Sequence, residues 1–211
     1  MIYVDTSFLF ALFVEQDHSD RASKWMDADA RPLWVTSFGI FEFEQALRLQ
    51  MFLFRKDRNR GLKESSAHLA FNHLRSQLKQ GVFVDCDYEW KAVLKEASRL
   101  SVEHTDSKGC RSMDVLHVAL ALHLGALEFL TFDANQKKLL AGLLAIFLGN
   151  LGIHKFILGY NTAGIIMIAL NLTCIGAPVI RIISLIEGIM YLVKSDEEFY
   201  NTYLANRREW F

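Results

Sequence analysis

The last third of this 211-residue chain carries almost no charge. Residues 1–140 contain 18 Lys and Arg and 19 Asp and Glu, whereas residues 141–211 contain five of each kind, most of them after Val193. A nearly uncharged span of about fifty residues suits hydrocarbon better than water. The sequence therefore predicts two modules in different solvents, a soluble module followed by a membrane-embedded one.

Net charge and cysteine placement exclude several classes of protein. The net charge of −1 gives the chain as a whole no attraction to polyanions. Cys86, Cys110 and Cys174 are isolated, which argues against a zinc ribbon, a thioredoxin-type site and a disulfide scaffold. No signal peptide opens the chain, so we expect the first module in a reducing cytoplasm and any membrane targeting to come from the internal apolar segment.

Short apolar strands alternate with helices over residues 1–138. We expect strands at residues 2–5, 33–36, 82–85 and 128–133, with helices after the first two strands and at residues 62–80, 88–104 and 112–125. Few hairpin turns separate these segments. Such alternation predicts an α/β fold, with a parallel sheet covered by helices on both faces.

Four carboxylates fall where such a sheet collects its ligands. Asp5 and Asp133 each end an apolar strand. Asp114 begins a helix, and Glu42 lies on the helix after the second strand. Ligands of open parallel sheets bind outside the carboxyl ends of the strands. Clustered carboxylates repel one another unless a cation lies between them, and oxygen ligands suit Mg²⁺ or Mn²⁺, which can activate water for phosphodiester hydrolysis.

The motifs around these acids, "YVDTS", "FGIFEFEQALR", "RSMDVLHVALALHLGA" and "FLTFD", resemble the PIN domain, the fold of VapC-type toxin ribonucleases. The resemblance covers residues 1–138 and implies RNA hydrolysis with Mg²⁺ or Mn²⁺. It also implies two candidate partners, an antitoxin protein and a second copy of the chain in a homodimer. By position it implies four metal-binding, catalytic acids and three supporting hydroxyl groups: Asp5, Glu42, Asp114 and Asp133, and Thr6 or Ser7 together with Thr131.

Each acid also has a purely structural interpretation. Asp5 and Asp114 can cap or begin a helix without binding any ligand. Either Glu42 or Glu44 can face the cleft, and the spacing from the preceding strand favours Glu42. The four acids together are a stronger indication than any one of them.

Histidines and a basic run leave further alternatives open. His117 lies on an apolar helix, where a satisfied core histidine is commoner than a ligand, and the same holds for His104 and His123. The run at residues 55–63, "RKDRNRGLK", either grips phosphates or forms a solvated loop between helices, and the loop is the commoner case.

The apolar segment is long enough to cross a bilayer twice. We expect a two-helix transmembrane hairpin at residues 139–195, with apolar runs at 139–158, 162–180 and 182–193, followed by an aqueous or interfacial tail at 196–211. The alternative is a buried helical hairpin in a larger soluble core. That alternative is less favoured, because the first module already covers its own sheet.

The segment from "KKLLAGLLAIFLGNLGIHKFILG" onward resembles the TM-two family of small membrane proteins over residues 137–199, most specifically in "LGIHKFILG". Arg181 departs from this pattern, and Glu187, six residues later, could offset its charge. Lys137 and Lys138 before the first run favour a cytoplasmic first module, and we expect the bacterial inner membrane as the location. This resemblance implies membrane lipid as a partner and supplies location more than chemistry.

The predicted helix after Asp133 runs directly into the apolar segment, where PIN domains usually continue to a final edge strand. Losing that strand exposes backbone groups and loosens the cleft. Three hypotheses of function follow. The chain is a membrane-tethered ribonuclease, a catalytically impaired PIN-like head that binds RNA or protein, or a membrane protein whose head is incidental.

Overall fold

The structure, a computed structural model, describes residues 1–108, 111–173 and 176–211. The chain forms two compact units, Met1–Trp90 with Leu130–Phe132, and Lys91–Phe129 with Asp133–Phe211. Helix α6 (Ser112–His123) contacts α7 (Ala134–Leu148) within the second unit. The domain boundary that we predicted after residue 138 stays a prediction.

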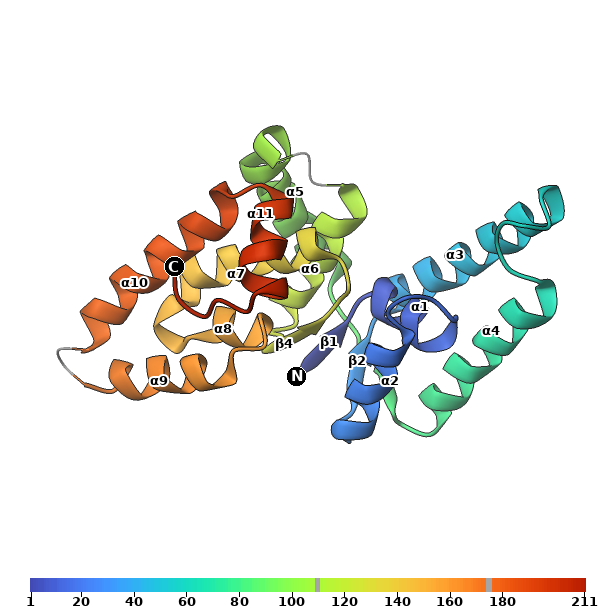
Figure 1. Cartoon of the computed structure of the whole chain (residues 1–211), viewed down its shortest axis with the longest axis horizontal. Coiled ribbons are helices and arrows are strands. Elements are labelled where there is room, and N and C mark those ends of the chain that lie inside the picture. Colours follow the sequence, from blue (N-terminus) through green and yellow to red (C-terminus); the bar gives the residue numbers. More distant parts are fainter. Residues whose placement is uncertain (109–110, 174–175) are drawn as a thin grey trace. The chain divides into compact units, whose positions relative to one another are not determined.

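Four short strands form a single sheet (Figure 1). The strands are β1 (Ile2–Val4), β2 (Leu33–Val35), β3 (Phe83–Asp85) and β4 (Glu128–Leu130), in the order β3-β2-β1-β4. β1 pairs with β2, and β2 with β3, in parallel. The predicted parallel α/β sheet is therefore confirmed, and the carboxyl ends of these strands share one edge.

The helices of the first unit are α1 (Thr6–Phe13), α2 (Ser19–Ala28), α3 (Ser37–Lys56) and α4 (Glu64–Lys79). Their apolar faces and the strands bury one core, to which Phe8, Phe43, Leu74 and Phe83 contribute. The sequence analysis did not predict α2, because this helix is mostly polar and buries only Ala22 completely.

The second unit is almost entirely helical. It contains α5 (Trp90–Lys108), α6 (Ser112–His123), α7 (Ala134–Leu148), η1 (Gly149–Leu151), α8 (Ile153–Ile157), α9 (Asn161–Asn171), α10 (Gly176–Val193), α11 (Asp196–Phe199) and η2 (Tyr200–Ala205). α7 contacts α6, α8, α10 and α11 (Figure 1). As predicted, α7 continues into the apolar segment, and no strand follows β4 in the part of the chain that the structure describes.

The predicted apolar runs do not coincide with single helices. Run 139–158 is divided among α7, η1 and α8, with Gly152 in the left-handed conformation between the last two. Run 162–180 is divided between α9 and α10. Within the described residues, α10 is the helix long and apolar enough to cross a bilayer. Two crossings therefore stay a prediction.

The outer faces of α9 and α10 are mostly apolar, although Arg181 on α10 is also exposed. Their exposed side chains are Ile165, Ile166, Ile168, Leu170, Leu172, Val179, Ile182, Leu185, Ile186, Ile189 and Val193. Polar residues of α10, among them Ser184 and Glu187, are buried instead. Apolar groups outside and polar groups inside are the arrangement expected of helices in lipid.

Small residues bring α7 and α10 into close contact. A Cβ added at Gly188 would lie 2.9 Å from the Gly142 carbonyl oxygen, and one at Gly149 would lie 2.1 Å from Ser184 Cβ. The Ser184 hydroxyl donates to the Gly149 carbonyl at 2.9 Å. Glycine and serine permit this approach because they have little or no side chain at the contact, as in packed membrane helices.

The C-terminal tail is packed against the helices of the second unit. Phe199 and Tyr203 are buried, and the Tyr160 hydroxyl donates to the Tyr203 carbonyl. Lys138 on α7 pairs with Asp196 at 2.6 Å. These contacts join part of the tail to the helices, and its aqueous or interfacial location stays a prediction.

Replacing Gly188 by valine tests the contact between α7 and α10. The added atoms would overlap Gly142 and Ala145, so we expect Gly188→Val to destabilise the full chain by about 1–3 kcal/mol, the usual cost of overpacking. The readout is its melting temperature in detergent. Ile189→Val, at an exposed neighbour, is the control and should change little. An unchanged melting temperature for Gly188→Val would contradict close packing of the two helices.

Candidate functional site

Asp5 is a buried carboxylate at the end of β1, with 1% of its surface exposed. Its Oδ1 accepts from the Ser7 hydroxyl at 2.7 Å and from the Phe8 amide at 3.2 Å, which caps α1. Its Oδ2 accepts from the Thr131 hydroxyl at 2.9 Å. These donors fix the orientation of the carboxylate, and hydrogen bonds of this kind compensate for its burial.

Ser7 and Thr131 join the start of α1 to the segment after β4. Their hydroxyl groups lie 3.1 Å apart, and the Phe132 amide donates to Ser7 Oγ at 2.8 Å. The Asp5 amide donates to the Leu130 carbonyl at 3.1 Å. The structure thus brings together three of the predicted site residues in the first unit.

Glu42 and Glu44 have different surroundings on α3. The Thr6 hydroxyl, one residue after Asp5, donates to Glu42 Oε2. Glu44 instead lies 2.8 Å from Arg48 and 3.8 Å from Arg75. Glu42 is therefore the glutamate held beside the start of α1, whereas Glu44 is neutralised by arginines at the surface.

The pKa of Tyr3 is raised in part by negative charge near this edge of the sheet. Burial raises the pKa of the Tyr3 phenol, and the charges of Asp5 and Glu42 raise it further. Both carboxylates are thus close enough to act on one buried group within the first unit.

Asp114 and Asp133 lie together in the second unit. Asp133 caps α7 through its Oδ1, which accepts from the amides of Asn135 at 2.7 Å and Gln136 at 3.2 Å. The Gln136 side chain donates to Asp114 Oδ1 at 3.2 Å. Burial raises the pKa of Asp114, and the charge of Asp133 raises it further, while the hydrogen bond from Gln136 lowers it.

Gln136 is a site residue that the sequence analysis missed. It is buried, and it contacts both acids of this pair, one through its backbone and one through its side chain. The signal was available, because an N-cap Asp followed three residues later by Gln is a capping-box pattern.

The donor set fits a hard divalent cation, because all four acids offer carboxylate oxygens and their neighbours offer hydroxyl and amide groups. The structure places Asp5 and Glu42 in one unit and Asp114 and Asp133 in the other. Among the residues it describes, no group of three or more His, Cys, Asp or Glu side chains is arranged to hold a metal. Convergence of the four acids stays a prediction.

The other candidate residues are not placed as ligands. His117 is buried on α6, as expected of a core histidine, whereas His123 is exposed at the end of that helix, contrary to our expectation. The side chain of His104 lies outside the described residues, as do Cys110 and Cys174.

The Cys86 thiol is structural. It donates to the Val35 carbonyl at 3.0 Å, and burial raises its pKa to about 11. A thiol that is protonated and buried in this way is a poor nucleophile and a poor metal ligand.

Glu187 has two basic partners that the sequence analysis did not consider. Its carboxylate lies 2.5 Å from Lys155 Nζ and 3.1 Å from His154 Nε2, and all three side chains are completely buried. Lys155 also lies 4.3 Å from the ring centre of Trp210 in the tail. These charges are paired inside the helical unit, as ionisable groups at membrane depth are expected to be.

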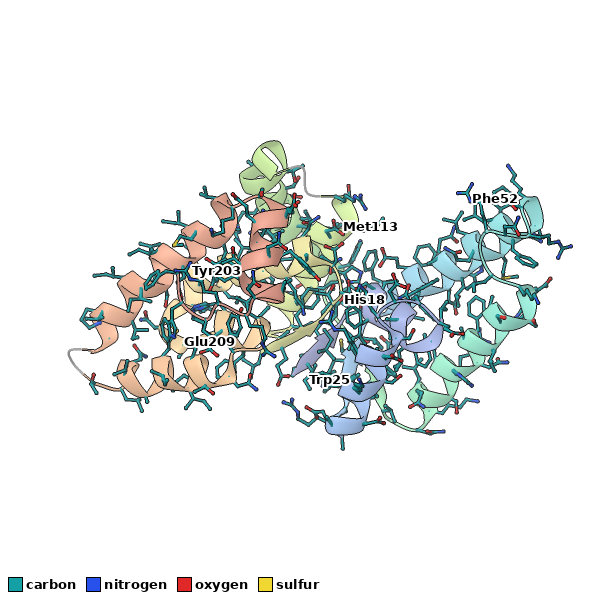
Figure 2. All side chains as sticks on the ribbon, in the orientation of Figure 1. His18, Trp25, Phe52, Met113, Tyr203 and Glu209 are labelled. Atoms are coloured by element: carbon teal, nitrogen blue, oxygen red, sulfur yellow. The ribbon has the colours of Figure 1, made fainter. Side chains whose placement is uncertain are left out.

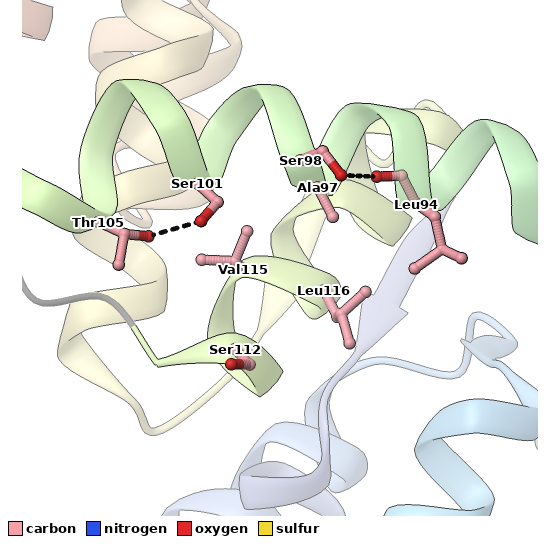
Figure 3. Close-up of a pocket in the computed structure, with 8 residues that line it drawn as sticks. All are labelled: Leu94, Ala97, Ser98, Ser101, Thr105, Ser112, Val115 and Leu116. Atoms are coloured by element: carbon pink, nitrogen blue, oxygen red, sulfur yellow. Dashed lines mark hydrogen bonds between the residues drawn. The ribbon is translucent and has the colours of Figure 1, made fainter.

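A separate pocket of about 250 Å³ lies between α5 and α6 (Figure 3). Hydroxyl groups line part of it, including Ser98, Ser101 and Ser112. Its described lining contains no carboxylate or imidazole, so this pocket offers no metal or acid–base chemistry.

Two family models match overlapping parts of the chain. The PIN domain model matches residues 2–140, and the TM2 domain model matches residues 134–189. The overlap, residues 134–140, is the first half of α7. The predicted fusion of these two domains is therefore confirmed.

One relative supports the membrane part. The chain is 45% identical over 73 residues to the uncharacterized membrane protein YozV of Bacillus subtilis (strain 168). The alignment covers 33% of this chain and 87% of that relative. Together with the TM2 match, this similarity supports membrane association of the C-terminal part.

Removing the charge of Asp114 should raise stability at neutral pH. The pKa of Asp114 in the folded chain is raised above its unfolded value of about 3.9. Stability that is present below pH ~4 is therefore lost as the pH rises through the folded pKa. In the presence of a chelator, we expect the melting temperature of Asp114→Asn to exceed that of the wild type at pH 7. At pH ~3, the two melting temperatures should be equal. A variant that melts below wild type at pH 7 would show that the charge itself stabilises the metal-free protein.

Proposed function

Because the chain belongs to the PIN domain family and carries a TM2 domain, we propose that it is a membrane-tethered ribonuclease of the toxin type that hydrolyses RNA phosphodiesters with Mg²⁺ or Mn²⁺. The observation that carries the proposal is the buried carboxylate of Asp5, oriented by Ser7 and Thr131 at the ligand-binding edge of a parallel sheet. PIN domains generally depend on a divalent metal, and the donor set fits one.

The proposed roles follow from the contacts of each acid. Asp5 and Asp114 are the main metal ligands, and Glu42 and Asp133 complete the shell or orient the attacking water. Ser7 and Thr131 position Asp5, as residues behind a metal ligand commonly do.

A bound Mg²⁺ or Mn²⁺ would stabilise negative charge on the phosphodiester and make a bound water more acidic. The residues supply the remaining functions. Thr6, which follows Asp5 in the chain, donates a hydrogen bond to Glu42. Gln136, which follows Asp133 by three residues, donates a hydrogen bond to Asp114. Burial and the charge of Asp133 raise the pKa of Asp114, and a bound cation would favour the ionised form of this carboxylate.

The membrane tether is proposed to leave the nuclease in the cytoplasm. Lys138, before the apolar segment, pairs with Asp196 after it, so the two flanks of the helical module lie together. Lys194, two residues before Asp196 in the chain, belongs to the same flank, and basic residues at a flank favour the cytoplasmic face of a bacterial inner membrane.

A catalytically impaired head that binds RNA or protein is the second candidate. It is favoured by α7, because Asp133 Oδ1 is used to cap a helix that continues into the membrane module. An antitoxin protein and a second copy of the chain remain candidate partners under either function.

Loss of single acids tests the nuclease. We expect Asp5→Asn and Asp114→Asn each to reduce Mn²⁺-dependent cleavage of RNA by the full chain about 10²–10³-fold or more, the scale of losing one preorganised electrostatic contact. Glu44→Gln is the matched control and should retain activity, because Glu44 pairs with arginines. Cleavage that survives both substitutions and a chelator would contradict the proposal.

Metal binding distinguishes the two candidates independently of turnover. A native-state ligand at a hundredfold excess over its Kd stabilises a protein by about 2.7 kcal/mol. We therefore expect saturating Mn²⁺ to raise the melting temperature of the full chain, and Asp5→Asn to abolish the increase. RNA binding without any Mn²⁺ stabilisation would favour the non-catalytic head.

A further inference from the structure

The loop between α3 and α4 gathers cations on one end of the first unit. We define the α3–α4 tip as residues 51–65, in which α3 ends at Lys56 and α4 begins at Glu64. Its five basic side chains have no carboxylate within ion-pair distance among the residues that the structure describes: Arg55, Lys56, Arg58, Arg60 and Lys63. The tip also contains the acids Asp57 and Glu64, so five cations against two acids leave an excess of three positive charges, which attracts an external polyanion.

The backbone of the tip is folded tightly against α3. The Leu62 amide donates to the Gln50 carbonyl at 3.1 Å, and Arg60 N donates to Asp57 O at 3.0 Å. Gly61 has φ +76°, and a Cβ there would lie 2.1 Å from the Gln50 carbonyl oxygen. A close approach and a positive φ both require glycine, so the loop has one defined path.

Aromatic rings hold two of the cations in place. The Arg58 guanidinium lies 4.9 Å from the ring centre of Phe54, and Lys56 Nζ lies 4.7 Å from that of Phe52. Phe52 is exposed near the end of α3 (Figure 2). Such cation–π contacts reduce the freedom of otherwise mobile side chains.

The tip contains a pocket of about 480 Å³. Its walls carry three cations, Arg55, Arg58 and Lys63, and one acid, Glu64. Lys63 is the N-cap of α4 and gives that helix no side-chain cap. The pocket thus combines an excess of positive charge with ample room for a phosphate group.

The tip shares a helix with the candidate site. Thirteen residues of α3 separate Glu42 from Arg55, which corresponds to about 20 Å at 1.5 Å per residue. With one phosphate every ~3.4 Å along a stacked strand, that distance is about six nucleotides. A strand whose scissile phosphate lies at the carboxylates therefore reaches the tip only when it is several nucleotides longer.

We propose that the α3–α4 tip is a second binding site for RNA phosphates, which holds single-stranded RNA at a distance from the carboxylates. The proposal rests on the RNA substrate proposed above and adds a length requirement to it. A long strand contacts both sites, and a short one contacts only the carboxylates.

The test compares RNA of about twenty nucleotides with RNA of about three, below the ~six-nucleotide separation. Binding of the labelled long RNA to the full-length protein is measured in detergent, with a chelator present so that the RNA is not cleaved. We expect R55Q/R58Q/K63Q to weaken this binding roughly tenfold and to reduce the slope of log K against log salt by about two, at ~0.7 per phosphate contact. With Mn²⁺, the same variant should raise KM for the long RNA and leave cleavage of the short RNA unchanged.

K24Q/K79Q/K91Q, three exposed lysines elsewhere, is the matched control. Unchanged binding of long RNA by the tip variant, or an equal loss in the control, would overturn the proposal. It would also fail if nanodiscs containing phosphatidylglycerol reduced wild-type RNA binding to the level of the tip variant, because the tip would then hold lipid headgroups. Absence of cleavage would defeat the nuclease alone, since binding in a chelator still measures the tip.

Discussion

One helix, α7, carries the contacts on which both domains depend. Its N-terminus is capped by Asp133, and its first turn holds Asp114 through Gln136. One turn further, Lys138 pairs with Asp196 from the far end of the membrane module. The same helix is then buried against α10 and matches the end of one family model and the start of another. A change in how α7 packs in the membrane module would therefore be felt directly by two of the candidate metal ligands.

Structural and chemical demands meet at the acids. Asp5 and Asp133 are both helix N-caps, so one carboxylate oxygen of Asp5 accepts from one backbone amide and one of Asp133 accepts from two before any metal binds. Asp114 lies in the first turn of α6 with a raised pKa. A cation would neutralise the negative charge of these carboxylates, which the protein neutralises only in part. Functional sites commonly lower the stability of the folded protein in this way. The α3–α4 tip is positively charged, whereas the acids are negative, and the proposed RNA would contact both the tip and the metal-binding acids.

The sequence predicted what depends on local pattern. Strand ends, α3, α6 and the break in charge within α7 follow from hydrophobic periodicity and composition. It did not predict α2, because the apolar side chains of that helix, Ala22, Trp25 and Met26, are few and lie in a mostly polar sequence. It also did not predict the division of the apolar runs, where Gly152 and Pro178 lie close to the breaks. The buried group of His154, Lys155 and Glu187 joins residues far apart in the chain, and no spacing rule connects them.

The proposed nuclease requires that Asp5, Glu42, Asp114 and Asp133 together bind a divalent cation. Anomalous diffraction from crystals of the full chain grown with Mn²⁺ tests this most directly. We expect a Mn²⁺ peak with carboxylate oxygens of Asp5 and Asp114 at bonding distance, and Glu42 or Asp133 in direct or water-mediated contact. Saturating Mn²⁺ with no peak at these side chains, or a peak that lacks Asp5 or Asp114 as a ligand, would contradict the proposed metal site.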